Sequence, residues 1–328
     1  MDFVEKLEYY ASLGLIPPRD KRLFLQFYTE HTKALQTNGI DPAPYHPLFL
    51  SFLEKFKEQI ASPHSFSHYH QRIRKPFDYY KLGLDLIRPL IDIPHSSVQD
   101  HKILQEIAQK LQEGENVIFL SNHQSEADPH ALSLLLEERY PDLAEQLICV
   151  AGDRVLTDPF AIPFSMGRNL LCIYSKRHID NPPEQKQQKQ LYNKKTMERM
   201  SELLSEGGRA IYVAPSGGRD RADASGIIHV APFDPQSIEM LCLMASKASK
   251  PTSFYPMALS TYNLLPPPKT VEKELGEERK AGYGAAHLWV GPKISMDNFP
   301  GDKHSKRKNR ALFIWSQVEQ AYRNFSCK

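Results

Sequence analysis

The sequence predicts an α/β fold, in which a small N-terminal helical bundle packs against a larger α/β domain with a mixed sheet flanked by helices. Two observations predict it. In the first 75 residues, apolar side chains recur at three- and four-residue steps, which is the spacing of helices. After about Pro76, apolar runs alternate with helical patterns, as they do in an α/β sheet. A chain of 328 residues is long enough for both parts, so we expect domains at residues 1–75 and 76–328.

Three helices are expected in the N-terminal part. The first begins near Val4, and the second carries apolar residues at helical spacing and ends at Asn38-Gly39, a typical stop signal. The third runs roughly from Leu48 to Ile60. Short turns that contain Pro and Gly join these helices, which is the pattern of a small bundle. We find no catalytic combination of residues in this part of the sequence.

The α/β part is expected to form strands within six apolar runs, at residues 117–120, 147–151, 171–174, 210–214, 253–259 and 287–290. Helices are expected between several of them. One begins at Asp128-Pro129, where Asp128 would cap the helix. Another runs from Glu184 to about Ser205, and a third begins at Asp234. Ligands of α/β sheets bind beyond the carboxyl ends of strands, and both polar motifs of this chain directly follow predicted strands.

The first motif is Asn122-His123-Gln124-Ser125-Glu126-Ala127-Asp128-Pro129, which places an imidazole and a carboxylate five positions apart. In a continuous helix the two would lie ~140° apart around the axis, and Pro129 disfavours helical angles at Asp128. We therefore expect a loop that brings the carboxylate of Asp128 back to His123. Such a contact fixes the tautomer of the His and leaves its other ring nitrogen free to act as a base. A solvated loop with a capping Asp is the simpler alternative.

The second motif is Ala214-Pro215-Ser216-Gly217-Gly218-Arg219-Asp220-Arg221. Gly217-Gly218 can adopt positive φ, so that bare backbone amides can approach an anion. Arg219 and Arg221 can bind a phosphate bidentately. The alternative is a tight turn in which both arginines pair with Asp220 and Asp223.

Cationic residues from separate segments are expected to meet at one edge of the sheet. Arg177 and His178 follow the predicted strand at residues 171–174 and would reach the same edge as Arg219 and Arg221. This convergence favours an anionic substrate. The net charge of only +2 argues against a nucleic-acid partner.

The sequence contains no apolar run near the ~20 residues needed to span a bilayer. Its first residues lack the features of a secretory signal. We therefore expect a soluble, cytoplasmic protein. A basic run at residues 306–310 allows at most a peripheral contact with anionic lipid.

The two motifs together resemble the soluble, plastid-type glycerol-3-phosphate 1-acyltransferases, a family that is also found in some bacteria. The resemblance rests on residues 122–129, 214–223 and 87–92, and it covers most of the chain. It implies a small helical domain against a larger α/β domain, and a location in the plastid stroma if the chain is a processed plant form. It also implies that His123 is the catalytic base, that Asp128 is its partner, and that a basic cluster holds the substrate phosphate, formed by Arg177, His178, Arg219 and Arg221. One departure is visible, because the family more often has Lys at the position of Arg177.

The function that the resemblance implies is transfer of a fatty acyl group to the sn-1 hydroxyl of glycerol 3-phosphate, giving lysophosphatidic acid. The donor would be a thioester of acyl carrier protein or of coenzyme A. We expect direct transfer without an acyl-enzyme, in which His123 takes the hydroxyl proton and Asp128 stabilises the imidazolium. Anchoring of the phosphate can contribute ~7–11 kcal/mol by orientation. Apart from the thioester co-substrate, no cofactor and no metal is expected.

Three other functions remain open from the sequence. The acceptor could be lysophosphatidate, although such enzymes usually carry membrane anchors. His123, Glu126 and Asp128 could ligate a metal for hydrolysis. The chain could also be a non-catalytic phosphate-binding module. For an acidic carrier protein, the basic residues that could form a docking surface are Lys186, Lys189, Lys194 and Lys195, or Arg72, Arg74 and Lys75.

Overall fold

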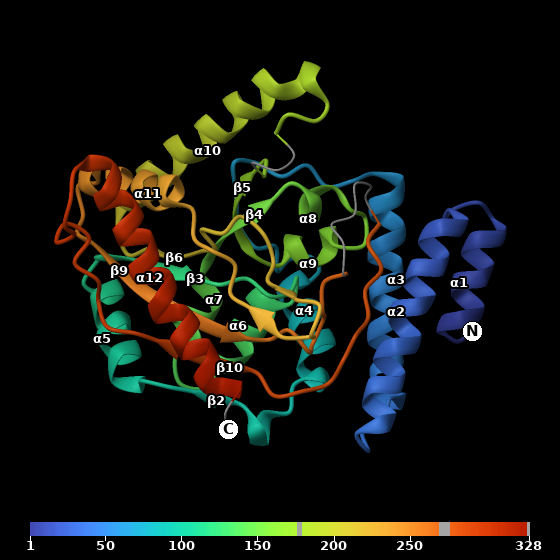
Figure 1. The fold of residues 1–328 in the computed structure, drawn as a ribbon. Helices are drawn as coiled ribbons and strands as arrows, with labels where there is room; N and C mark the ends of the chain where they lie inside the picture. Colours follow the sequence, from blue (N-terminus) through green and yellow to red (C-terminus); the bar gives the residue numbers. More distant parts are fainter. Residues whose placement is uncertain (176–178, 269–275, 327–328) are drawn as a thin grey trace.

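The computed structural model describes residues 1–175, 179–268 and 276–326 of the chain. An eight-stranded sheet lies at its centre, with the strand order β1-β5-β4-β6-β3-β9-β10-β2 (Figure 1). The strands from β5 to β9 in this order are parallel to one another, whereas β1 and β10 run antiparallel to their neighbours β5 and β9. The predicted mixed α/β fold is therefore confirmed. The strands are β1 (Tyr69–His70), β2 (Ser97–Val98), β3 (Asn116–Ser121), β4 (Ile148–Gly152), β5 (Asn169–Ile173), β6 (Ala210–Val213), β9 (Thr252–Ser260) and β10 (His287–Val290), with a separate hairpin of β7 (Arg221–Ala222) and β8 (Ile228–His229).

The central strands form because their side chains are apolar on both faces. Every residue of β3 is buried, as expected for a parallel strand covered on both sides. The register pairs Leu120 of β3 with Val213 of β6 and with Pro256 of β9. The carboxyl ends of these strands consequently lie side by side, and the two polar motifs leave the sheet at this edge.

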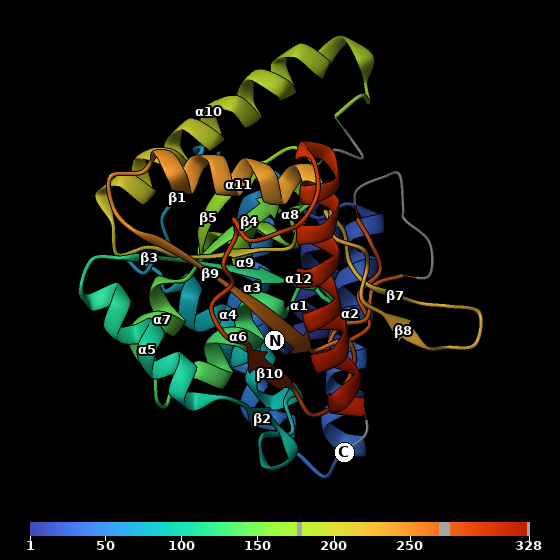
Figure 2. The same cartoon turned by 60° about the vertical axis from the view of Figure 1, so that its left-hand side comes forward.

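Helices cover both faces of the sheet. In Figure 2, α10 and α11 lie above the sheet, and α5 and α7 lie below it. Two separate hydrophobic clusters fill the space between sheet and helices, one on the side of α10, α11 and α12 and the other on the side of α5, α6 and α7. These helices are α5 (His101–Gln112), α6 (Asp128–Leu136), α7 (Pro141–Gln146), α10 (Lys186–Glu206), α11 (Pro235–Lys247) and α12 (Lys303–Ser326). Within the described residues, no helix is both long and apolar enough to cross a bilayer.

The N-terminal helices pack beside this body through aromatic side chains. Phe24, Phe27 and Phe52 all contact the ring of Phe160 edge to face, at centroid distances of 5.0 to 5.4 Å. One hydrophobic cluster joins these helices to the helices that lie beneath the edge at which the two polar motifs leave the sheet. The helices involved are α1 (Phe3–Ser12), α2 (Pro18–Thr37), α3 (His46–Ala61), α4 (Tyr79–Ile87) and α9 (Ile162–Met166), and the short α8 (Arg154–Thr157) follows β4. The domain boundary at residue 75 stays a prediction.

The structure corrects two local expectations. Asp128 is not the N-cap residue of α6. It is the first residue of the helix, and Ala127 occupies the N-cap position. Its carboxylate is occupied by other donors, which are described below. Of the two glycines in the second motif, only Gly217 has positive φ, at 66°.

Candidate active site

The loop after β3 brings His123 and Asp128 together. Nδ1 of His123 lies 2.7 Å from Oδ2 of Asp128. The side chain of Asp128 is fully buried, whereas that of His123 is 29% exposed. The loop therefore makes the contact that the sequence predicts, with the acid inside and the imidazole open to a cavity.

Asp128 is held in place by three further donors. Its carboxylate accepts hydrogen bonds from the backbone amides of Gln124 at 2.8 Å and Ser125 at 3.0 Å, and from the hydroxyl of Thr261 at 2.5 Å. A carboxylate accepts only, so the ring nitrogen of His123 that contacts it is the protonated one. The other ring nitrogen is then free to accept a proton. Thr261 lies 133 positions from Asp128, and no motif in the sequence announces it.

Asp220 connects the second motif to the first. Its backbone amide donates to the carbonyl of His123 at 2.6 Å. Its carboxylate accepts from the side-chain amide of Asn122 at 3.0 Å and from the amide of Ala231 at 2.9 Å. Only 1% of Asp220 is exposed, and this burial raises the pKa of its carboxyl to about 6. The two loops therefore form one hydrogen-bonded unit.

Arg219 belongs to a partly buried network of charges. Its two terminal nitrogens donate to the carboxylate of Glu277 at 2.7 and 2.6 Å, and Glu126 lies 3.9 Å away. Arg279 in turn binds Glu126 at 2.7 Å and Asp158 at 2.8 Å. Burial alone would raise the pKa of Glu126, but the charges of Arg279 and Arg219 outweigh it and lower that pKa. The network joins four segments of the chain, at residues 126, 158, 219 and 277–279.

These contacts overturn one alternative for the second motif. Arg219 does not pair with its neighbour Asp220. Asp223 binds His229 at 2.9 Å and caps the turn of its own hairpin. Arg221 donates to the carbonyls of Arg219 and of Pro268, at 3.2 and 3.4 Å. The arginines therefore do not form the tight turn of local Arg–Asp pairs.

Two of the predicted phosphate-binding residues, Arg177 and His178, lie outside the described residues. Glu126 faces Arg279 rather than the pair of His123 and Asp128. Within the described ranges, no group of three or more His, Cys, Asp and Glu side chains is arranged to hold a metal ion. The contacts of Glu126 thus give the metal alternative no geometric support.

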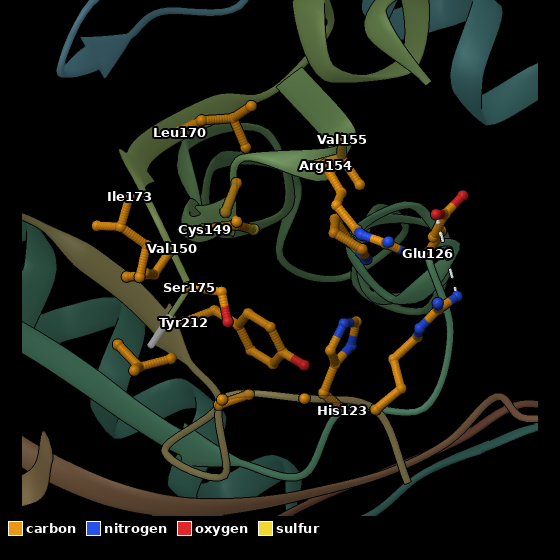
Figure 3. Close-up of a pocket in the computed structure, with 18 of the residues that line it drawn as sticks. His123, Glu126, Cys149, Val150, Arg154, Val155, Leu170, Ile173, Ser175 and Tyr212 are labelled. Atoms are coloured by element: carbon orange, nitrogen blue, oxygen red, sulfur yellow. Dashed lines mark ion pairs between the residues drawn. The ribbon is translucent and has the colours of Figure 1, made fainter. Parts of the chain in front are cut away.

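A cavity of about 520 Å³ opens in front of His123. Figure 3 shows His123, Tyr212 and Arg154 pointing into the same space. The phenol of Tyr212 donates to the carbonyl of Asn122 at 2.9 Å and so supports the backbone next to His123. Figure 3 shows polar side chains, among them Arg154 and Glu126, at one end of the cavity, and the apolar Val150 and Ile173 at the other. Further apolar lining residues are Met197, Met200, Met240 and Leu241.

Arg154 is a cationic lining residue that the sequence analysis missed. It is the first residue of α8 and follows the carboxyl end of β4, so it reaches the same edge as the two motifs. Its position directly after an apolar strand was the signal that could have identified it. Arg219 and Arg221 also line the cavity. The guanidinium groups of Arg154, Arg219 and Arg221, which come from two segments of the chain, therefore border one space.

The chain is similar in sequence to known acyltransferases. The sequence model of a family described as Acyltransferase matches residues 102–260. The chain is 45% identical to the chloroplastic glycerol-3-phosphate acyltransferase of Spinacia oleracea, 42% to that of Pisum sativum and 36% to that of Arabidopsis thaliana. Each match covers 98% of this chain, and 69%, 72% and 71% of the respective relative. The crystal structure of a 1-acyl-sn-glycerophosphate acyltransferase from Thermotoga maritima aligns with a TM-score of 0.46 at 15% identity, over 93% of this chain and 95% of that one.

Proposed function

Because the chain belongs to the family of the chloroplastic glycerol-3-phosphate acyltransferases, we propose that His123 is the general base in its acyl transfer to glycerol 3-phosphate. The single observation that carries this role is the contact between His123 and the fully buried Asp128 at the wall of the cavity. The carboxylate fixes the ring and stabilises the imidazolium that forms. The free ring nitrogen faces the space in which a substrate hydroxyl would lie.

The reaction then proceeds in one transfer. The free nitrogen of His123 accepts the proton of the acceptor hydroxyl as its oxygen attacks the carbonyl carbon of the acyl thioester. A carbon–oxygen bond forms, the carbon–sulfur bond breaks, and the leaving thiolate takes the proton from the imidazolium. The products are an ester of glycerol 3-phosphate and a free thiol. No side chain of the enzyme carries the acyl group, and no cofactor takes part apart from the thioester itself.

The substrate phosphate is held by the guanidinium groups at the polar end of the cavity. Arg154 and Arg221 line this end from different segments, and guanidinium binds phosphate in a planar, bidentate way. Arg219 also lines it and donates both terminal nitrogens to Glu277, so we assign it to orienting the loop as well as adding positive charge. The sequence-based assignment of Arg177 and His178 to the same cluster is retained as part of the proposal.

The acyl donor is a thioester of acyl carrier protein or of coenzyme A. On α10, Lys194 is 72% exposed and Lys186 is 49% exposed, which supports this helix as a docking surface for an acidic carrier protein. Arg72 and Arg74 are less exposed, at 26% and 44%, and both bind Glu145, at 2.9 and 2.6 Å. The relatives are named chloroplastic, which supports a plastid-stroma location for this chain.

The variant His123→Ala tests the assignment of the base. We expect kcat to fall by about 10²–10⁴-fold, while titration calorimetry still detects binding of glycerol 3-phosphate, because the arginines are intact. His95→Ala is the matched control: His95 also contacts a carboxylate, that of Asp92 at 2.9 Å, but its side chain is 78% exposed and it does not line the cavity. Full activity of His123→Ala would refute the proposal, as would an equal loss in His95→Ala.

A further inference from the structure

We propose that the outer faces of α11 and α12 form a docking surface for an anionic lipid bilayer. The surface, called the α11–α12 patch below, combines exposed apolar side chains with lysines. Its apolar members are Met240 and Leu243 on α11, 40% and 50% exposed, and Leu312 and Phe313 on α12, 60% and 45% exposed. Its basic members are Lys303, Lys306 and Lys308.

One ion-paired contact joins the two helices that carry these apolar residues. Glu239 of α11 binds Arg310 of α12 at 2.8 Å and Arg307 at 3.1 Å. Met240 and Leu243 lie within about one turn of Glu239 on α11. Around the axis of α12, Phe313 lies about 60° and Leu312 about 160° from Arg310, so Phe313 is on the side of α11 and Leu312 extends the surface to the outer side of α12. Figures 1 and 2 both show the start of α12 beside α11 at the edge of the molecule.

The outward position of Leu312 and Phe313 is set by the packing of α12. Ala311, Ile314 and Val318 are buried against the sheet, so the neighbouring positions 312 and 313 point away from it. Phe313 touches only the edge of this surface, where its ring lies 5.6 Å from that of Phe299. Exposed Leu and Phe on one helix face, next to lysines, are the composition of interfacial membrane-binding helices.

Charge favours a bilayer with anionic lipids. Residues 303–310 read Lys-His-Ser-Lys-Arg-Lys-Asn-Arg and contain no acid. Glu239 neutralises part of this charge through Arg307 and Arg310. Lysines close to an anionic membrane each strengthen binding by about fivefold, and their aliphatic stems allow them to lie along the lipid surface.

The patch is continuous with the proposed active site. Met240 lines the cavity in front of His123 and is also 40% exposed on α11. An acylated product has an apolar chain that is costly to release into water. Contact of the patch with a bilayer would give this chain an apolar exit next to Met240. This last step rests on the proposed function, whereas binding of the patch to a bilayer does not.

Co-sedimentation with lipid vesicles tests the patch. The full chain is mixed with vesicles of phosphatidylcholine alone, or of phosphatidylcholine and phosphatidylglycerol in about a two-to-one ratio. We expect binding to the anionic vesicles, weakened by added salt. The double variant Leu312→Ser/Phe313→Ser should weaken it by at least about tenfold. The triple variant Lys303→Ala/Lys306→Ala/Lys308→Ala should weaken it by on the order of 100-fold.

Matched control variants distinguish binding through the α11–α12 patch from nonspecific binding to lipid. Leu13→Ser/Leu15→Ser removes two apolar side chains that are 54% and 44% exposed at the end of α1, and Lys186→Ala/Lys194→Ala/Lys195→Ala removes three lysines of α10. Both should bind vesicles like the wild type, and so should His123→Ala, even if the catalytic proposal fails. Thermal unfolding and activity with a soluble thioester confirm that the patch variants are folded.

The inference would be overturned if the wild type did not bind anionic vesicles, or if the control variants lost as much vesicle affinity as the patch variants. If the variant Lys303→Ala/Lys306→Ala/Lys308→Ala bound vesicles as tightly as the wild type but had a raised KM for acylated carrier protein, the surface would be assigned to that protein instead.

Discussion

At the scale of single residues, the buried carboxyl of Asp220 makes the stability of the fold depend on pH. The ordinary pKa of its carboxyl is 3.8, and burial raises it to about 6 in the folded chain. A carboxyl that holds its proton more tightly in the folded state opposes folding once it ionises. Its effect on stability is therefore most favourable at low pH and worsens as pH rises from 3.8 to about 6. Above that window the penalty is constant, at roughly 3 kcal/mol by the 1.36 kcal/mol of each pKa unit.

The variant Asp220→Asn removes this titration. Between pH 4 and pH 7, the free energy of unfolding of the wild type should fall by about 2 kcal/mol relative to that of the variant. Other titrating groups are common to both proteins and cancel in the difference. Urea unfolding of both proteins at several pH values measures it. Parallel pH profiles would show that Asp220 has no raised pKa.

At the scale of secondary-structure elements, the sequence predicted the interior of the sheet and missed its margins. β3 and β9 are buried on both faces, so each leaves a continuous apolar run that can be recognised without any knowledge of its neighbours. β1 and β2 have two residues each, which is too short for a periodic pattern. α12 begins with the basic run at residues 303–310, so its helical start carried no apolar signal.

The same distinction between local and long-range information applies to the site. The contact of His123 with Asp128 was predictable because one loop contains both residues. The contacts of Arg219 with Glu277, and of Asp128 with Thr261, join residues 58 and 133 positions apart. Only the strand order brings such residues together, and no residue spacing in the sequence encodes it.

The packing of α4 on α6 offers a prediction at this scale. A methyl group added at Gly83 of α4 would lie 2.6 Å from Nε2 of His130 on α6. His130 is only 4% exposed, and neither of its ring nitrogens has a hydrogen-bond partner among the described residues. Its pKa lies well below the ordinary value because of burial and the charge of Arg168. Gly83→Ala should therefore destabilise the protein by roughly 1–3 kcal/mol through overpacking.

The sign of this effect should reverse when His130 is shortened. In a His130→Ala background the added methyl group meets no imidazole, and replacing Gly by Ala inside a helix normally stabilises by about 0.5–1 kcal/mol. A double-mutant cycle measured by urea unfolding tests the reversal. If Gly83→Ala destabilises both backgrounds equally, the close approach to His130 is not the cause.

At the scale of the whole molecule, Arg279 connects the N-terminal helices to the loop that contains His123. Its guanidinium lies 4.7 Å from the ring centre of Phe160, which packs against Phe24, Phe27 and Phe52. The same guanidinium binds Glu126 of the first motif. Arg279 is only 6% exposed, and the neighbouring carboxylates raise its pKa. The loop of His123 is thereby braced against the N-terminal helices.

Removing this charge should weaken both the fold and the reaction. Arg279→Met leaves Glu126 and Asp158 largely buried without their shared cation, which should cost about 3–5 kcal/mol at pH 7. Unpaired buried carboxyls have raised pKa values, so protonation should return part of the loss at pH 5, and the gap to the wild type should narrow as pH falls. Because Glu126 lies in the loop of His123, kcat should fall as well.

Arg310→Met is the matched control, since Arg310 is equally buried and binds a carboxylate on α11. This variant should lose stability and keep its kcat. Urea unfolding at both pH values, with kcat measured at low temperature where both variants are folded, distinguishes a brace of the active site from a brace of the fold alone. An unchanged kcat in folded Arg279→Met would limit Arg279 to the second role.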